Sequence, residues 1–265
     1  MSNPETYYRD HWLVVEPERL EAYEKMFEWH PRMAPLLEPA DLEPGQTVVD
    51  YGCGPGLLTL ELARRVGPNG HVHGVDINAG FVERARNRLA EQGLGERVTI
   101  HQIEKDGLPL PDASADRVVC KNVLEYVDDP AATLAEFRRG LRPGGLAHAI
   151  DSDWGLLTVE PLGPEPIAEL FEAARPAYRT PLIGRRLYGL FRAAGFDEVK
   201  VRVLAGADTH GRMLPILSNM ATYARASGRM QDSRIDRILE DAQAAAAAGT
   251  LLLLLPQFLV TGAAP

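Results

Sequence analysis

The chain has 265 residues, of which 45% are hydrophobic and 25% charged, a composition typical of a globular protein. It excludes a collagen, a disordered tail protein and a disulfide scaffold. Lys and Arg number 28 against 37 Asp and Glu, so the formal net charge is −9. We therefore expect no nucleic-acid partner, because neutralising phosphates requires a basic face.

The cysteine count and the apolar segments bear on where the protein works. Cys53 and Cys120 are the only cysteines; they lack metal spacing and cannot form a framework, which favours a reducing cytoplasm. The N-terminal segment has neither the basic nor the apolar region of a signal peptide. Residues 242–264 are mostly apolar, but Gly249 and Pro256 interrupt them. They predict an alanine-rich helix followed by a buried strand, and we expect no membrane partner.

Residues 1–40 predict an irregular helical arm, cut by prolines. Aromatic residues are frequent in it: Tyr7, Tyr8, Trp12, Tyr23, Phe27 and Trp29. Such an arm either covers a site as a lid or is simply docked on the domain, and the pattern leaves both open.

From residue 41 onward the chain predicts one domain in which strands and helices alternate. The predicted strands are residues 47–50, 72–75, 98–103, 117–120 and 146–150, and the predicted helices are 57–66, 79–92 and 131–141. This alternation indicates a parallel sheet with helices on both faces.

After Asp151 strands and helices no longer alternate regularly, but the linker signals are too weak to separate a second domain. We expect helices near 167–174 and 182–194, a strand over 198–204 and a last strand over 251–260. The domain over 41–265 thus carries two helical insertions, near residues 155–181 and 207–248.

The most informative segment is a glycine loop directly between the first strand and the first helix. Gly52, Gly54 and Gly56 alternate with other residues there. Glycines permit positive φ and close approach of a ligand to the backbone. The N-terminus of the following helix offers free amide donors and a partial positive charge. No Gly-Lys-Ser/Thr ending follows, so the loop is not a phosphate-binding P-loop.

Two acidic residues restrict the class of ligand that the loop can bind. The dinucleotide fingerprint needs Gly or Ala where Leu57 stands, and Asp50 before the loop would repel a diphosphate. Asp50 suits a ligand that carries an amine and a sulfonium. Asp76 ends the second strand about 20 residues after Gly56, the separation expected of an acid that accepts ribose hydroxyls. The pattern predicts an adenosyl ligand.

Four segments extend the pattern: VVDYGCGPG (48–56), GVDIN (74–78), LPLPDASADRVVCKNVLEYVDDP (108–130) and LRPGG (141–145). At these residues the chain resembles the class I S-adenosylmethionine-dependent methyltransferases, in particular the small-molecule, ubiquinone/menaquinone-methylase-like branch (methyltransferase type 11). The resemblance implies an α/β three-layer sandwich. Its Rossmann-like sheet has seven strands, mostly parallel with an antiparallel last strand, and helical lid insertions. It also implies S-adenosyl-L-methionine as cofactor.

The resemblance also implies a role for individual residues. Asp76 would hold the ribose, Ile77 would pack on the adenine and Glu104 would meet the adenine amino group. Glu125 and Tyr126 replace the histidine pair that is frequent after the fourth strand. The implied cofactor-binding residues are Asp50, Gly52, Cys53, Gly54, Asp76, Ile77, Ile103, Glu104, Lys121 and Asn122.

Methyl transfer is an in-line displacement with a neutral leaving group, so alignment is the main requirement and can supply about 7–11 kcal/mol. A base is needed only when the nucleophile must lose a proton. The candidate catalytic residues are His11, Asp153 and His210. Each has a structural alternative, as a packed or exposed histidine or as a loop cap. No residue cluster has metal spacing, so no metal ion is predicted.

The sequence therefore predicts a methyltransferase for a small, partly apolar metabolite. Two alternatives stay open: a nicotinamide-dependent oxidoreductase, and a non-methylating cyclase or binding protein that keeps the cofactor. The acceptor atom and the oligomeric state, monomer or homodimer, are not determined by the sequence.

Overall fold

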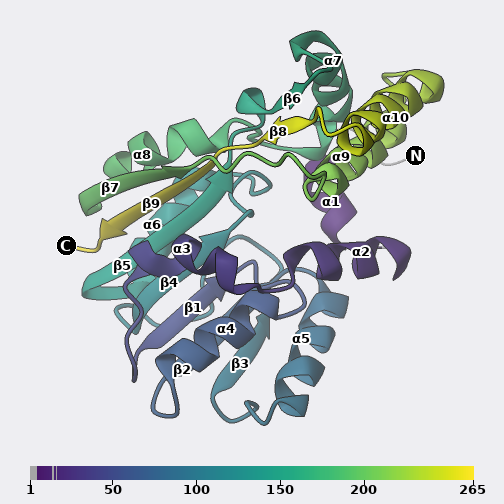
Figure 1. The fold of residues 1–265 in the computed structure, drawn as a ribbon. Helices are drawn as coiled ribbons and strands as arrows, with labels where there is room; N and C mark the ends of the chain where they lie inside the picture. The colour runs from purple at the N-terminus through teal and green to yellow at the C-terminus, as the bar shows by residue number, and fades with distance from the viewer. Residues whose placement is uncertain (1–4, 14, 16) are drawn as a thin grey trace.

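The computed structural model describes residues 5–13, 15 and 17–265, so residues 1–4, 14 and 16 of the predicted arm lie outside the described residues. Seven strands form one sheet in the order β3-β2-β1-β4-β5-β9-β7 (Figure 1). Their bounds are β1 (Thr47–Tyr51), β2 (His71–Asp76), β3 (Val98–Gln102), β4 (Ala115–Lys121), β5 (Leu141–Ser152), β7 (Asp197–Leu204) and β9 (Gln257–Ala263). Strands β1 to β5 pair in parallel, and β9 is antiparallel to both β5 and β7. The predicted fold class is confirmed.

Helices cover both faces of the sheet. Helices α3 (Ala34–Leu37), α4 (Leu57–Val66) and α5 (Ala79–Glu91) pack on one face, and α6 (Pro130–Gly140) and α8 (Ile183–Ala193) on the other. Val48 and Val49 in β1 are fully buried in the two different cores. A continuous apolar run is typical of a parallel strand buried on both sides, because successive side chains point to opposite faces.

A second body, here called the cap, has its own apolar core. It contains α7 (Pro164–Ala174), α9 (Leu214–Ser227), α10 (Asp232–Ala247) and a small antiparallel sheet of β6 (Thr158–Glu160) and β8 (Leu252–Leu254). Leu170, Tyr223 and Ile238 are buried at its centre. In Figure 1 these elements gather beyond the end of the main sheet where the arm also lies.

The described part of the arm runs from the cap to the sheet. It consists of α1 (Tyr7–Leu13), α2 (Pro17–Phe27) and two short 3₁₀ turns that flank α3, at Pro31–Met33 and Glu38–Ala40. Two further 3₁₀ turns, Trp154–Leu156 and Arg175–Ala177, lie near the cap. Arg19 ties the arm to the cap, because its guanidinium donates to the Tyr223 hydroxyl at 3.0 Å.

The prediction of one strand over 251–260 is wrong. Pro256 interrupts it, because proline has no N–H for a strand ladder. The segment before it is β8 in the small sheet, and the segment after it is β9 in the main sheet. The preceding alanine-rich segment forms α10 as expected. Within the described part of the chain, none of the helices has the length and apolar character needed to cross a membrane.

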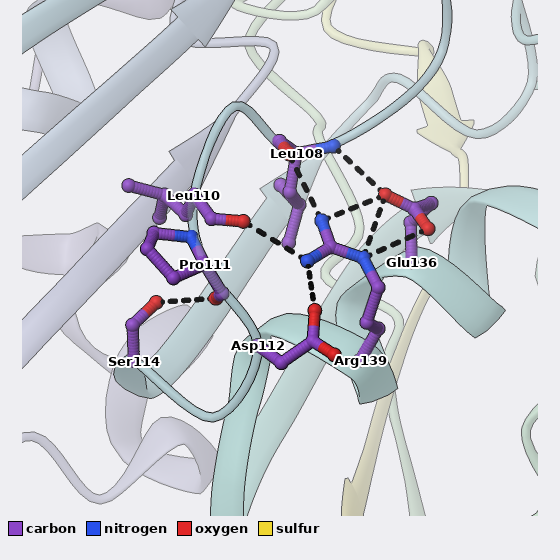
Figure 2. Close-up of polar contacts among 7 residues, drawn as sticks. All are labelled: Leu108, Leu110, Pro111, Asp112, Ser114, Glu136 and Arg139. Atoms are coloured by element: carbon purple, nitrogen blue, oxygen red, sulfur yellow. Dashed lines mark hydrogen bonds and ion pairs between the residues drawn. The ribbon is translucent and has the colours of Figure 1, made fainter.

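The connection between β3 and β4 has no regular structure, and one arginine holds it in place. Figure 2 shows Arg139 of α6 donating to the carbonyl oxygens of Leu108 and Leu110, each at 2.9 Å. The same guanidinium pairs with Asp112 at 2.7 Å and Glu136 at 2.9 Å. This loop therefore has a fixed shape beside the site described next.

Candidate active site

The glycine loop adopts backbone conformations that favour glycine. Gly52, Gly54 and Gly56 have φ of +75°, +51° and +82°. A Cβ on Gly52 would lie 2.2 Å from a methyl carbon of Val123, so this position also needs the missing side chain. The loop brings its backbone to the carboxyl ends of β1 and β2, where ligands bind in parallel sheets.

Asp76 joins the end of β2 to this loop. One carboxylate oxygen accepts the N–H of Gly54 at 2.7 Å, and the other accepts the N–H of Asn78 at 2.8 Å. Burial raises the pKa of Asp76 to about 6. The N–H of Ile77 also bonds this carboxylate, and because a carboxylate has about four acceptor sites it can still accept a hydrogen bond from a ligand.

Unlike Asp76, Asp50 makes its hydrogen bond away from the cavity. Its buried carboxylate accepts the hydroxyl of Thr59 in α4 at 2.6 Å, and burial raises its pKa to about 7. It does not line the cavity described below. The structure therefore places Asp50 behind the glycine loop, and not in direct contact with the space where the methionine half was expected.

A first cavity lies above the ends of β1, β2 and β4. Its volume is about 700 Å³, including the part that is open to solvent. Six of the residues that the resemblance implied line it: Gly52, Gly54, Asp76, Ile77, Ile103 and Asn122. On the opposite side the arm supplies Trp12 and Tyr23, and Tyr23 stacks on Phe81 with ring centroids 5.8 Å apart. Aromatic faces attract cations such as a sulfonium.

The other implied residues lie elsewhere. Cys53 lines a smaller neighbouring cavity, and Lys121 lines that cavity and the second cavity described below. Glu104 is exposed and does not line the first cavity. Asp106 of the same loop does line it, and its carboxylate accepts the N–H of Asp128 at 3.1 Å. Asp106 lies in the same loop as the Leu108 and Leu110 carbonyls that Arg139 holds.

These features fit an adenosyl ligand. A Cβ built on Gly54 would lie 3.8 Å from the Tyr23 ring and hydroxyl, so the arm lies directly over this part of the loop. The indole N–H of Trp12 is buried and has no hydrogen-bond partner in the structure, which leaves a donor at the cavity wall. Asp76 offers the acceptors that a ribose diol needs, and Ile77 and Ile103 offer apolar contacts for a flat base.

A second, larger cavity adjoins the first; its volume is about 1330 Å³, again including the part that is open to solvent. The two cavities share the side chains Trp12, Tyr23, Asn122 and Tyr126 as a common wall. Apolar side chains dominate the rest of its lining, and they come from the arm, the sheet ends and the cap: Met26, Phe27, Met33, Leu36, Leu204, Met213, Ile216 and Leu255.

Three charged residues lie in the lining of this largely apolar cavity: Arg32, on the arm, and Lys121 and Glu125, at the end of β4 and in the turn after it. The Lys121 ammonium lies 4.5 Å from the centre of the Phe27 ring, and burial lowers its pKa to about 8. Glu125 is 2% exposed, and one of its carboxylate oxygens accepts the indole N–H of Trp154. Burial and nearby Asp151 raise the pKa of Glu125.

The three predicted catalytic residues do not line either cavity. Asp153 is fully buried but forms an ion pair with Arg185, with one N–O distance of 2.7 Å, and caps the turn at Gly155. His210 is exposed, with its ring 3.1 Å from the Thr209 hydroxyl.

The His11 ring packs against four aromatic rings, those of Tyr7, Trp12, Tyr126 and Tyr223. One ring nitrogen faces the Tyr7 carbonyl at 2.5 Å, and the other has no partner. Burial lowers the pKa of His11 to about 3, so the ring is neutral at physiological pH. This environment is that of a packed side chain.

Several residues at the site were missed from sequence. Asp106 gave no signal that distinguished it from Glu104. Glu125 did give one, because it stands where related sequences frequently have histidine, but its burial beside Trp154 depends on contacts 29 residues apart. Trp12 and Tyr23 belonged to the aromatic arm without being singled out.

Comparisons with known proteins agree with this geometry. Residues 48–145 match the family model of the methyltransferase domain. The chain is 39% identical over 171 residues to an uncharacterized 37.1 kDa protein in transposon TN4556 of Streptomyces fradiae, covering 61% of this chain and 46% of that protein. It is 38% identical over 109 residues to the ubiquinone/menaquinone biosynthesis C-methyltransferase UbiE of Hahella chejuensis, covering 41% and 44%. The chain thus spans less than half the length of these curated relatives.

Solved structures share the fold. Haemonchus contortus phosphoethanolamine N-methyltransferase 2, in complex with phosphomonomethylethanolamine and S-adenosylhomocysteine, aligns with a TM-score of 0.67 at 17% identity, covering 100% of this chain and 61% of that one. A SAM-dependent methyltransferase from Aquifex aeolicus aligns with a TM-score of 0.54 at 22% identity, covering 72% and 93%.

Residues 48–145 are therefore a methyltransferase domain, and the chain has the fold of the class I S-adenosylmethionine-dependent methyltransferases. S-adenosylmethionine is the cofactor of this class. A second UbiE, from Xanthomonas campestris, is 37% identical over 120 residues, covering 43% of this chain and 47% of that protein.

Proposed function

We propose that this protein transfers the methyl group of S-adenosylmethionine to a small, partly apolar molecule. One observation carries the proposal: the first cavity, built on the glycine loop and Asp76, shares a wall with a larger apolar cavity. A donor in the first cavity and an acceptor in the second would meet at Asn122 and Tyr126. Such an arrangement supplies the alignment on which an in-line displacement depends.

In this proposal each wall of the first cavity contacts one part of the cofactor. Asp76 accepts the ribose hydroxyls, and Ile77 and Ile103 enclose the adenine. Asp106 takes the position at the adenine edge that was expected for Glu104. Gly54 and its neighbours in the loop face the methionine half, whose sulfonium lies against the rings of the arm.

The arm over 1–40 and the insertions near 155–181 and 207–248 act as a lid over the acceptor. The lining of the second cavity supports this role, because Met26 belongs to the arm and Met213 to the second insertion. Their apolar character favours an apolar acceptor and keeps water from the reacting atoms.

We further propose that the protein works in the cytoplasm on a small-molecule partner, without nucleic acid. Cys53 and Cys120 are both free and buried, which suits a reducing compartment.

Calorimetric titration with S-adenosylhomocysteine and with NADH tests the proposal. We expect S-adenosylhomocysteine to bind and NADH to bind at least about a hundredfold more weakly, since Leu57 and the buried acids disfavour a diphosphate. Tight binding of NADH alone would support the oxidoreductase alternative. Incorporation of labelled methyl across a metabolite panel then separates a methyltransferase from a protein that only keeps the cofactor.

A further inference from the structure

Lys121 and Glu125 are two charged residues of the second cavity that the proposed function has not yet used. Lys121 ends β4, and Glu125 follows it in the next turn, so both lie beside the shared wall of the two cavities. The Glu125 carbonyl accepts the N–H groups of Arg179 and Thr180, both at 2.9 Å, which fixes this turn against the segment that follows α7. A carboxylate held in this way has a defined position in the cavity wall.

Three buried carboxyl groups lie close enough to Lys121 to act on its charge, and only Glu125 reaches the cavity. Asp50 accepts the Thr59 hydroxyl behind the glycine loop. The Asp151 carboxylate accepts the N–H groups of Leu124 and Ser152. The other two acids are hydrogen-bonded away from the second cavity, while Glu125 is the one of the three that belongs to its lining.

The Glu125 carboxylate keeps capacity for a further hydrogen bond. Trp154 donates to one oxygen, and Tyr126 is also within reach of the carboxylate. An ionised carboxylate has about four acceptor sites, so a hydroxyl of a bound molecule can be accommodated. Burial beside Asp151 raises the pKa of Glu125 and so favours its protonated form, while the nearby Lys121 charge lowers that pKa and favours the carboxylate that a base must be.

The remaining lining of the second cavity is largely apolar, with Phe27, Met213 and Ile216 among its side chains. A suitable acceptor therefore has an apolar body and one polar group directed at Lys121 and Glu125. A positive and a negative group in the lining of one cavity suit a hydroxyl that loses its proton as it reacts. Phenols and enols have this property.

Building on the proposed function, we propose that Glu125 is the general base and Lys121 the oxyanion partner for an apolar phenol or enol acceptor. The acceptor O–H bond breaks, and its proton moves to a Glu125 oxygen. The freed electron pair of the oxygen, or of a conjugated ring carbon, forms the bond to the methyl carbon. The S–C bond of the donor breaks, and its electron pair stays on sulfur as a neutral thioether. Methylation at carbon gives a dienone, which loses its ring proton to water and takes the proton back from Glu125 onto oxygen as the phenol re-forms.

A binding comparison tests this role without a known acceptor. The protein is saturated with S-adenosylhomocysteine and titrated with 4-nitrophenol or with nitrobenzene, which has the same ring and no hydroxyl. We expect the phenol to bind at least about tenfold more tightly, and we expect Glu125→Leu and Glu125→Gln to reduce this preference to about threefold or less. Lys121→Met should lower the phenolate fraction of bound 4-nitrophenol, read from its absorbance.

Equal binding of the two probes to the wild-type protein overturns the inference, as does a preference retained in both Glu125 variants. Failure of the proposed function looks different, because S-adenosylhomocysteine itself would then not bind in the loading step. The two failures are therefore distinguishable in one series of titrations.

Turnover with labelled donor and a panel of phenols adds a kinetic test. We expect Glu125→Gln to lower kcat about a hundredfold or more, with the KM for the donor unchanged and partial recovery in Glu125→Asp. Glu169→Gln is the matched control, since Glu169 pairs with Arg234 on the cap surface. A Glu125→Gln rate within about threefold of wild type overturns the inference; where no phenol is turned over, the binding comparison decides it.

Discussion

The sheet and the cap contribute to the two cavities in different ways. On the sheet side, a few residues at consecutive strand ends form the first cavity, and most of its polar contacts involve the backbone. On the cap side, the lining of the second cavity is assembled from side chains distant in sequence, such as Met26, Met213 and Leu255. The first arrangement depends on local patterns that many sequences can share. The second can vary without disturbing the first, so cofactor use and acceptor choice can change independently.

The largest expected effects are on the free energy of unfolding, from one truncation in the core of the cap and one in the core of the sheet. Leu170 in the cap and Leu62 in α4 are both fully buried, and each Leu→Ala change should lower the free energy of unfolding by about 2–5 kcal/mol. We expect Leu170→Ala to leave S-adenosylhomocysteine affinity within about threefold of wild type, and Leu62→Ala, behind the glycine loop, to weaken it. Thermal unfolding and calorimetry measure both quantities. Equal losses of affinity in the two variants would contradict the division between sheet and cap.

Asp76→Ala tests the polar contacts of the first cavity. It removes the acceptors for the ribose and for the Gly54 N–H, so S-adenosylhomocysteine should bind more than about tenfold more weakly. Circular dichroism should show the fold intact. Asp50→Asn serves as the contrast, because Asp50 does not line the cavity and the amide can still accept from Thr59. A loss as large as that of Asp76→Ala would support the role that the resemblance implied for Asp50.

Arg139→Ala tests the loop between β3 and β4. The variant loses the bonds to two loop carbonyls shown in Figure 2, and the loop carries Asp106 of the cavity wall. We expect affinity for S-adenosylhomocysteine to fall about threefold to tenfold and stability by about 1–2 kcal/mol. Arg142→Ala is the control, because Arg142 pairs with Asp116 away from the cavity. Comparable affinity losses in both variants would remove the loop from the site.

The smallest effect concerns pH. Burial raises the pKa of Asp76 to about 6, so the group is ionised at pH 7 and takes up a proton as the pH falls through this value. The ionised form is the better acceptor for the ribose. Affinity for S-adenosylhomocysteine should therefore fall by about fourfold between pH 7 and pH 5.5. Calorimetry at several pH values measures this, and Asp76→Asn should abolish the dependence. A dependence that persists in the variant would come from another group.

The sequence predicted the sheet side well because its signals are local. The glycine loop, the acid at the end of β2 and the alternation of strands and helices are all encoded in short segments. The partners of Asp153 and His11 are not. Arg185 lies 32 residues from Asp153, and the rings around His11 include Tyr126 and Tyr223 from other elements. Only the fold shows that these groups are already engaged.

The same reasoning applies to the loop between β3 and β4 and to the error in the last strand. Which acid of residues 103–114 faces the cavity depends on the hydrogen bonds of Arg139, which lies in α6. The division of 251–260 could have been suspected from Pro256. The pairing of β8 with β6 could not, because β6 is separated from it by the whole cap.

The break at Pro256 makes one short stretch of chain a mechanical link between the two bodies. Leu254 is paired in the small sheet of the cap, and three residues later Gln257 is paired with Ser152 at the end of β5. Gln257 and Ser152 both line the second cavity. A shift of the cap that accompanies acceptor entry would therefore pull directly on the central strands at the base of that cavity, with almost no slack in the backbone to absorb it.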